Sequence, residues 1–227
     1  VRERLDALKE PLRGHMENLS VIRKSTQDFG DFGGVTLTTV GLFEDVCVTY
    51  LKSGSIDEVD IGTRFNQWRT TAEEEITSTG RAGARGLRMR AKLIGPDGVV
   101  AAETECGLEM EEGRYRTRQS LTVENPRLWW PKNYGDQPLY RLRVSLLREG
   151  VEVDCVWRTL GLRQLEKTGD MRFRVNGHEI KLWGGNLCEL DGRTHRWSEE
   201  RCAELMLRLE HLNVNLVRIW GGGMQYG

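Results

Sequence analysis

The sequence has few cysteines, and their spacing fits neither a metal site nor a disulfide framework. The 227 residues contain an odd number of them, without any CxxC pair: Cys47, Cys106, Cys155, Cys188 and Cys202. Zinc sites and small disulfide scaffolds need paired spacing, and the four histidines show no ligand spacing either. We therefore expect free thiols, no metal and no cofactor, and the thiols favour a reducing compartment such as the cytoplasm.

Neither an excess of charge nor a long apolar run is present. The net charge is −1 and the pI is about 6.5, so we expect no binding to nucleic acid or to an anionic membrane. No segment approaches the roughly 18 apolar residues of a membrane span, and no signal peptide is visible. The chain begins on valine and ends on a glycine turn. This indicates a segment cut at both ends and leaves a periplasmic or secreted origin open.

The most extensive positive signal is a series of short alternating segments between residues 56 and 163. In 87–93, apolar residues at every second position alternate with Arg88, Arg90 and Lys92, which predicts a strand with one dry face. Residues 140–146 repeat the pattern. About seven such strands in roughly 100 residues are typical of an immunoglobulin-like sandwich. Residues 21–51 are also rich in β-branched and aromatic residues, which favours strands.

The pattern changes after about residue 165. Asn176-Gly177 predicts a hairpin, whose second arm should run over residues 179–183 into a loop at Gly184-Gly185-Asn186. A helix with Ser198 as its N-cap should follow, and the apolar run at 214–220 predicts a parallel strand. Residues 179–220 therefore predict one βαβ unit.

Two residues near the end of this unit are candidates for a binding site. Arg218 lies near the carboxyl end of the predicted parallel strand, where α/β folds bind ligands, and a guanidinium there can hold a carboxylate. A structural ion pair is the alternative. Trp220 follows on the same side of the strand, where its ring could stack on a sugar or simply pack. The glycines at 221–223 match no phosphate-binding motif.

Other candidates have strong structural alternatives. Trp129-Trp130-Pro131 could form a sugar-stacking platform, but packing is the favoured interpretation. Carboxylates close in sequence could serve glycoside chemistry, although two of them fall in the first turn of the predicted helix, where they complement its dipole. The pairs are Asp28/Asp31, Glu189/Asp191 and Glu199/Glu200. No Ser-His-Asp order and no HExxH motif is present.

Four stretches together resemble glycoside hydrolase family 2, in its β-mannosidase-like branch. "ENPRLWWPKNYGDQPLYRLRV" is similar to the signature near the end of the family's immunoglobulin-like domain. "GLR" followed by "FRVNGHEIKLWGGN" resembles the entry into the catalytic barrel, and "LNVNLVRIWGGG" resembles the second barrel strand with its loop. "IRKSTQDFGDFGG" resembles the end of the N-terminal jelly-roll domain. The similarity is collinear over nearly the whole chain.

The resemblance implies three parts: the end of a jelly roll in 1–53, an immunoglobulin-like sandwich in 54–164, and the start of a (β/α)8 barrel in 165–227. It also implies four substrate-binding residues. Arg218 would lie beside the nucleophilic glutamate, Trp220 and Asn186 would line the sugar pocket, and Asp31 would reach the non-reducing sugar. Departures from the family pattern include Phe32 in a turn that usually carries tryptophan, and Leu187 in place of another tryptophan.

By the same resemblance, the parent protein would hydrolyse β-linked saccharides from the non-reducing end, with retention, through two glutamates on later barrel strands. A full barrel needs about 250 residues, so we expect this chain alone to be inactive and its partners to be a β-glycoside and the rest of the barrel. Exo-β-glucosaminidase, or another family 2 β-glycosidase, is the alternative within the family. A non-catalytic carbohydrate-binding or structural sandwich is the alternative from another class, and the βαβ unit argues against it.

Overall fold

The computed structural model describes residues 46, 48, 50, 53–187 and 198–219. They fall into two compact units, one from Val48 to Lys181 and the other containing the segment that begins at Leu182. The jelly roll expected in 1–53 lies almost entirely outside the described residues. The domain boundaries expected after residues 53 and 164 stay predictions.

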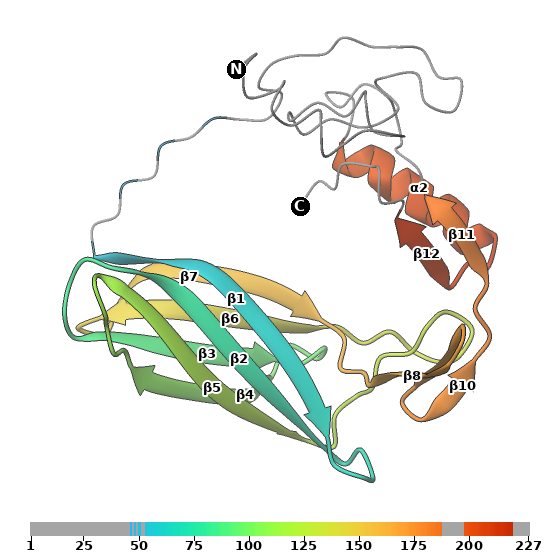
Figure 1. The fold of residues 1–227 in the computed structure, drawn as a ribbon, viewed down its shortest axis with the longest axis horizontal. Helices are drawn as coiled ribbons and strands as arrows, with labels where there is room; N and C mark the ends of the chain where they lie inside the picture. Colours follow the sequence, from blue (N-terminus) through green and yellow to red (C-terminus); the bar gives the residue numbers. More distant parts are fainter. Residues whose placement is uncertain (1–45, 47, 49, 51–52, 188–197, 220–227) are drawn as a thin grey trace, which may run out of the picture. The chain divides into compact units, whose positions relative to one another are not determined.

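The first unit contains a two-sheet antiparallel sandwich (Figure 1). One sheet has the order β1-β2-β5 and the other β4-β3-β6-β7. The strands are β1 (Gly54–Phe65), β2 (Thr71–Ala82), β3 (Leu87–Ile94), β4 (Val100–Gly107), β5 (Arg114–Glu124), β6 (Tyr140–Arg148) and β7 (Val151–Leu160). The prediction of about seven strands in an immunoglobulin-like sandwich is confirmed.

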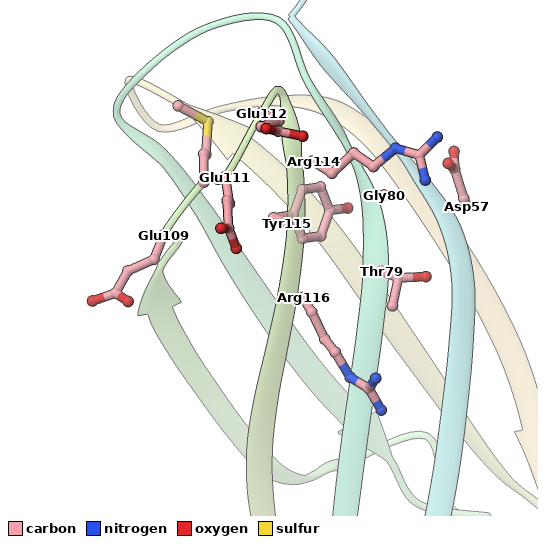
Figure 2. Close-up of a pocket in the computed structure, with 10 residues that line it drawn as sticks. Asp57, Thr79, Gly80, Glu109, Glu111, Glu112, Arg114, Tyr115 and Arg116 are labelled. Atoms are coloured by element: carbon pink, nitrogen blue, oxygen red, sulfur yellow. The ribbon is translucent and has the colours of Figure 1, made fainter.

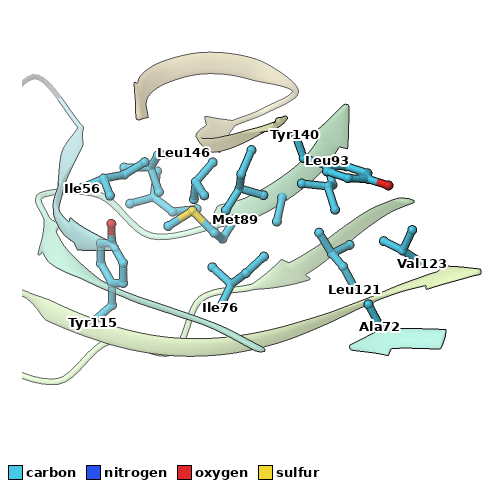
Figure 3. Close-up of a cluster of buried hydrophobic side chains, with 14 of the residues drawn as sticks. Ile56, Ala72, Ile76, Met89, Leu93, Tyr115, Leu121, Val123, Tyr140 and Leu146 are labelled. Atoms are coloured by element: carbon cyan, nitrogen blue, oxygen red, sulfur yellow. The ribbon is translucent and has the colours of Figure 1, made fainter. Parts of the chain in front are cut away.

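The core lies between the inner faces of the two sheets, where the predicted alternation is realised. The apolar residues of β3 at 87, 89, 91 and 93 are buried, and so are those of β6 at 140, 142, 144 and 146. Ile76, Leu121 and Val123 face them from the other sheet (Figure 3). Because side chains on a strand alternate between its two faces, the arginines at 88, 90, 141 and 143 are left on the outer face.

Hydrogen bonds at one end of the core tie β1 to strands of both sheets. The Asp154 carboxylate on β7 accepts from the Ile56 backbone N–H at 2.7 Å, and the Tyr115 hydroxyl on β5 donates to the Ser55 carbonyl at 2.8 Å. Burial, followed by the negative charges of Asp154 and Asp57, raises the pKa of Tyr115 well above its usual range. The hydroxyl therefore stays protonated and continues to donate.

A small three-stranded antiparallel sheet follows the sandwich within the same unit. It has the order β10-β9-β8, with β8 (Leu165–Gly169), β9 (Arg172–Val175) and β10 (His178–Ile180). Asn176 and Gly177 both have positive φ, 51° and 81°, as the turn of a two-residue hairpin requires. The predicted Asn-Gly hairpin is confirmed.

The side chain of Asn176 also anchors this hairpin to the segment that carries the paired tryptophans. Its oxygen accepts from the Gln164 N–H at 2.9 Å, and its amide donates to the Trp129 carbonyl at 3.0 Å. The Arg163 guanidinium lies 4.5 Å from the centre of the Trp129 ring, and Trp130 meets His178 edge-on at 5.3 Å. Both indoles are thus engaged in contacts within the unit, which supports packing over a sugar platform.

The second unit contains the βαβ element: β11 (Gly184–Leu187), α2 (Glu199–His211) and β12 (Leu216–Ile219). The strands are parallel, with Gly184 opposite Leu216. The sequence-based position of the first strand, residues 179–183, was wrong. His178–Ile180 pair with β9 instead, and the two glycines that were expected in a loop are the first residues of β11. The strand needs glycine at position 184, because a side chain there would overlap the Leu216 carbonyl.

The ends of α2 follow from its sequence. The Ser198 hydroxyl accepts from the Arg201 N–H at 3.3 Å, which confirms the predicted N-cap. At the other end Leu212 caps the helix, and Asn213 with φ of 57° turns the chain toward β12. No described residue of the helix is buried. None of the helices described is long and apolar enough to cross a membrane.

Gly80 on β2 tests the close approach of β1 and β5 at the hydrogen-bonded end of the core. A methyl group there would lie 2.5 Å from the Tyr115 hydroxyl oxygen and would overlap the Ser55 carbonyl. We expect Gly80→Ala to lower the free energy of unfolding by about 1–3 kcal/mol, as overpacking does, measured by urea unfolding. Gly62→Ala on the neighbouring strand meets nothing within 4 Å and should be close to neutral. Equal losses in the two variants would contradict this account.

Candidate functional site

Two of the four expected site residues lie side by side at the carboxyl ends of the parallel strands. Asn186 and Arg218 are register partners in β11 and β12. Arg218 Nη1 donates to Asn186 Oδ1 at 2.9 Å. Each residue is the last but one of its strand, so the pair lies at the edge where α/β folds bind their ligands.

The amino ends of the same strands are joined by a different asparagine. The Asn215 side-chain oxygen accepts from the Trp183 N–H at 2.8 Å, and the Asn215 N–H donates to the Trp183 carbonyl at 2.9 Å. The strand pair is therefore tied at both ends, by backbone and amide at one end and by amide and guanidinium at the other. This arrangement fixes which residue of β11 Arg218 meets.

The pair presents donors to solvent. Both side chains are exposed, and Arg218 forms no salt bridge within the described part of the chain. The structural ion pair considered from the sequence therefore has no partner there. A guanidinium that spends one N–H on an amide still has donors for a carboxylate or a sugar hydroxyl.

The other sequence candidates are not brought to this pair. Trp220 and Asp31 lie outside the described residues, as do Asp28, Glu189 and Asp191. Glu199 and Glu200 lie in the first turn of α2. The Ser198 hydroxyl, hydrogen-bonded to Glu200, together with the residue's own backbone N–H, lowers the pKa of that carboxyl. Helix capping thus accounts for both glutamates.

A recess that was not expected from the sequence lies on the sandwich. It is an open groove of about 900 Å³ at one end of the β1-β2-β5 sheet (Figure 2). Arg114 and Arg116 line it together with an acidic turn at Glu109, Glu111 and Glu112. The only advance signal was the charge-dense stretch "EMEEGRYR".

The groove lacks the features of a reaction site. The Tyr115 hydroxyl in its wall is committed to the Ser55 carbonyl, and its raised pKa keeps it from acting as a base near neutral pH. Over the described residues, no three His, Cys, Asp or Glu side chains are grouped so as to hold a metal. We therefore keep the Arg218–Asn186 pair as the candidate site.

The sandwich is similar in sequence to a family of known proteins. Residues 55–163 match the family model of glycosyl hydrolases family 2, which is the family suggested by the motifs at 124–144, 173–186 and 212–223. The matched sandwich domain belongs to this family. The match covers the described sandwich almost from end to end, so all seven strands lie in the segment that defines the family.

The similarity to individual relatives extends beyond the matched domain to nearly the whole chain. The chain is 30% identical over 221 residues to β-mannosidase B of Neosartorya fischeri, covering 93% of this chain and 25% of that protein. It is 24% identical over 200 residues to an exo-β-D-glucosaminidase of Hypocrea jecorina, covering 80% and 21%. The crystal structure of a β-D-mannosidase from Dictyoglomus thermophilum superposes with a TM-score of 0.79 at 27% identity, covering 90% and 26%.

These coverages limit what the family membership says about activity. The chain spans about a quarter of the length of the curated relatives that it matches. The similarity therefore supports the β-mannosidase-like branch of the family.

If the Arg218–Asn186 pair serves a ligand and not the fold, its loss should hardly affect folding. Because both side chains are exposed, we expect Arg218→Ala to change local stability by less than about 0.5 kcal/mol, measured by hydrogen exchange of the β12 amides. Asn215→Ala is the matched comparison on the same strand pair. It removes the acceptor of the Trp183 N–H and should cost about 1 kcal/mol. A loss in Arg218→Ala as large as in Asn215→Ala would indicate a structural role.

Proposed function

We propose that this chain is part of a retaining, exo-acting β-glycoside hydrolase of the β-mannosidase type. The observation that carries the proposal is the similarity to β-mannosidase B over 93% of the chain, together with a hydrogen-bonded arginine and asparagine at the carboxyl ends of two parallel strands. The substrate would be a saccharide with a β-linked, non-reducing terminal sugar.

Retaining hydrolysis needs two carboxyl groups about 5–5.5 Å apart. One attacks the anomeric carbon and forms a glycosyl ester while the other protonates the departing glycosidic oxygen. Water, deprotonated by the second group, then cleaves the ester. By the family resemblance, we assign both groups to later strands of the barrel. The proposed partner of this chain is therefore the remainder of the catalytic barrel, on the same polypeptide.

Within that site, Arg218 would bind and orient the nucleophilic carboxylate. A guanidinium beside a carboxylate favours the ionised form and lowers its pKa, which keeps the nucleophile charged at neutral pH. Asn186 already receives one N–H of the guanidinium, so it would limit the rotation of Arg218. Its own amide N–H groups would remain for a sugar hydroxyl.

Two further binding roles rest on the family resemblance alone. Trp220 would stack on the C–H face of the sugar, and Asp31 would accept hydrogen bonds from hydroxyls of the non-reducing sugar. No metal or cofactor enters the proposal, because double displacement by two carboxyl groups requires neither.

Exo-β-glucosaminidase is the second candidate, favoured by the similarity to the enzyme of Hypocrea jecorina. A glucosaminide carries an ammonium group, which would need carboxylates beyond the two catalytic ones. Comparing hydrolysis of 4-nitrophenyl β-D-mannoside with that of 4-nitrophenyl β-D-glucosaminide by the whole protein separates the two candidates.

The 227-residue chain alone should not hydrolyse either glycoside, because it would supply only part of the sugar-binding wall. Release of 4-nitrophenol, followed by absorbance, should equal the rate without protein. Turnover by the purified chain would refute the placement of both catalytic groups outside it. In the whole protein, we expect two glutamates downstream of this segment, each at the end of a predicted strand.

In the whole protein, Arg218→Ala should lower kcat for the preferred glycoside roughly 100-fold or more, because a misplaced nucleophile loses its attack geometry. Arg218→Lys should recover little of this, since an ammonium group cannot bind a carboxylate bidentately. Arg208→Ala, which removes an exposed ion pair with Glu204 on α2, is the control and should leave kcat unchanged. A wild-type kcat in Arg218→Ala would remove Arg218 from the site.

A further inference from the structure

Glu74 is buried in the middle of β2, on the face that meets the opposite sheet. Its exposed fraction is 1%, close to that of its same-face neighbours Ala72 and Ile76. Among the described residues it is the one buried side chain of a type that is normally charged. Three consecutive glutamates, residues 73–75, hide this arrangement in the sequence.

The carboxyl group of Glu74 is only half satisfied. Oε2 accepts from the Thr63 hydroxyl on β1 at 2.8 Å, and Oε1 has no hydrogen-bond partner within the described structure. Ser78 Oγ and Gln119 Oε1 lack partners as well. Gln119 is the register partner of Ile76, midway between Glu74 and Ser78, so these three groups share one patch of the inner face.

No cation compensates the carboxyl group from the strands that pack around it. The inner face of β1 contributes Ile61, Thr63 and Phe65, and that of β5 contributes Gln119, Leu121 and Val123. On the facing sheet the titratable groups are Tyr140, whose hydroxyl accepts from the Arg127 N–H, and Cys106, which contacts Thr117.

The remaining titratable groups of the interior lie elsewhere. Tyr115 is opposite Gly80, six residues along β2 from Glu74. Asp154 belongs to the same end, where it binds the Ile56 N–H. The Arg69 guanidinium, from the turn between β1 and β2, lies against Gly177. Glu74 is therefore surrounded by neutral groups.

An ionised carboxylate in this position would lose its hydration and gain only one neutral hydrogen bond, which is a costly exchange. Burying the neutral acid costs less free energy. Its O–H group is also a hydrogen-bond donor, and Gln119 Oε1 on the same patch is an acceptor without a donor. Burial accordingly raises the pKa of Glu74 to about 7, with the Thr63 hydrogen bond opposing the shift.

We propose that Glu74 is a built-in pH-sensitive element of the sandwich. It folds as the neutral acid, and its ionisation weakens the packing of the β1-β2-β5 sheet against the other sheet. The sandwich is thereby most stable in mildly acidic conditions.

The direction follows from proton linkage. The pKa of Glu74 is 4.5 in its ordinary state, taken for the unfolded chain, and about 7 in the folded chain. The unfolded chain loses the proton first as pH rises, so stability that is full below pH 4.5 is lost progressively up to about pH 7 and stays low above it. Between pH 5 and pH 8.5 the folding constant should fall on the order of 100-fold from this group.

The test is urea unfolding of the 227-residue chain at pH values from 5 to 8.5, for wild type, Glu74→Gln and Glu73→Gln. Glutamine keeps the shape of the side chain and can still accept from Thr63, but it does not titrate. We expect the folding constant of wild type to fall with pH and that of Glu74→Gln to lack this roughly 100-fold component. Glu73→Gln, at the exposed neighbour that accepts from Ser120, should keep the wild-type profile.

Direct titration of the carboxyl group by ¹³C NMR in the wild-type chain provides a readout that needs no folded variant. A Glu carboxyl signal with a midpoint near pH 7, absent from Glu74→Gln where that variant folds, supports the proposal. The proposal is overturned if every Glu carboxyl signal titrates below pH 5.5, or if Glu74→Gln keeps the full wild-type dependence on pH.

Discussion

The burial of two facing sets of side chains, one from each sheet, is the interaction on which this structure depends. The inner residues of β3 and β6 in one sheet, and Ile76, Leu121 and Val123 in the other, are almost wholly removed from water. Each fully buried aliphatic side chain of this kind contributes about 1.5–3 kcal/mol. The other observed contacts build on that core. The hydrogen bonds of Asp154 and Tyr115 hold β1 in place at one end of the core. The Asn176 amide attaches the small sheet to the segment at Trp129.

The same core explains why a lone glutamate inside it matters. In an exposed strand, a third consecutive glutamate would be unremarkable. Here Glu73 and Glu75 point outward and Glu74 points inward, because side chains alternate along the strand. The carboxyl group of Glu74 therefore loses its hydration when the apolar residues beside it are buried. The exclusion of water that stabilises the core also raises the pKa of this carboxyl group.

Much of this architecture could be predicted from the sequence, because the signals were local. Alternation in 87–93 and 140–146 predicted the inner faces, Asn176-Gly177 predicted the hairpin, and Ser198 predicted the start of the helix. The strand at 184–187 was missed because glycines normally indicate loops. Only the close approach of the Leu216 carbonyl, a contact between residues far apart in the chain, shows why glycine is needed there.

The candidate site illustrates the same division. Arg218 could be selected from its place at a strand end, and Asn186 only from the family resemblance. Their hydrogen bond could not be predicted, since it depends on which residues of β11 and β12 lie opposite each other. The inward direction of Glu74 was hidden for a related reason, because a run of three like residues gives no phase to the alternation. The roles of Trp220 and Asp31 stay predictions.

The parallel register of β11 and β12 determines which insertions this strand pair can tolerate. Neighbouring residues of a strand point to opposite faces, so a shift of one residue in register would turn Arg218 away from Asn186 altogether. The contact is thus all-or-none with respect to backbone pairing, while the length of the connection between the strands leaves it untouched so long as the pairing is kept. Insertions between residues 187 and 198 would therefore alter the surroundings of the site without dismantling the pair. A single residue added between Leu216 and Arg218, with the pairing of Gly184 and Leu216 kept, would move Arg218 out of register with Asn186.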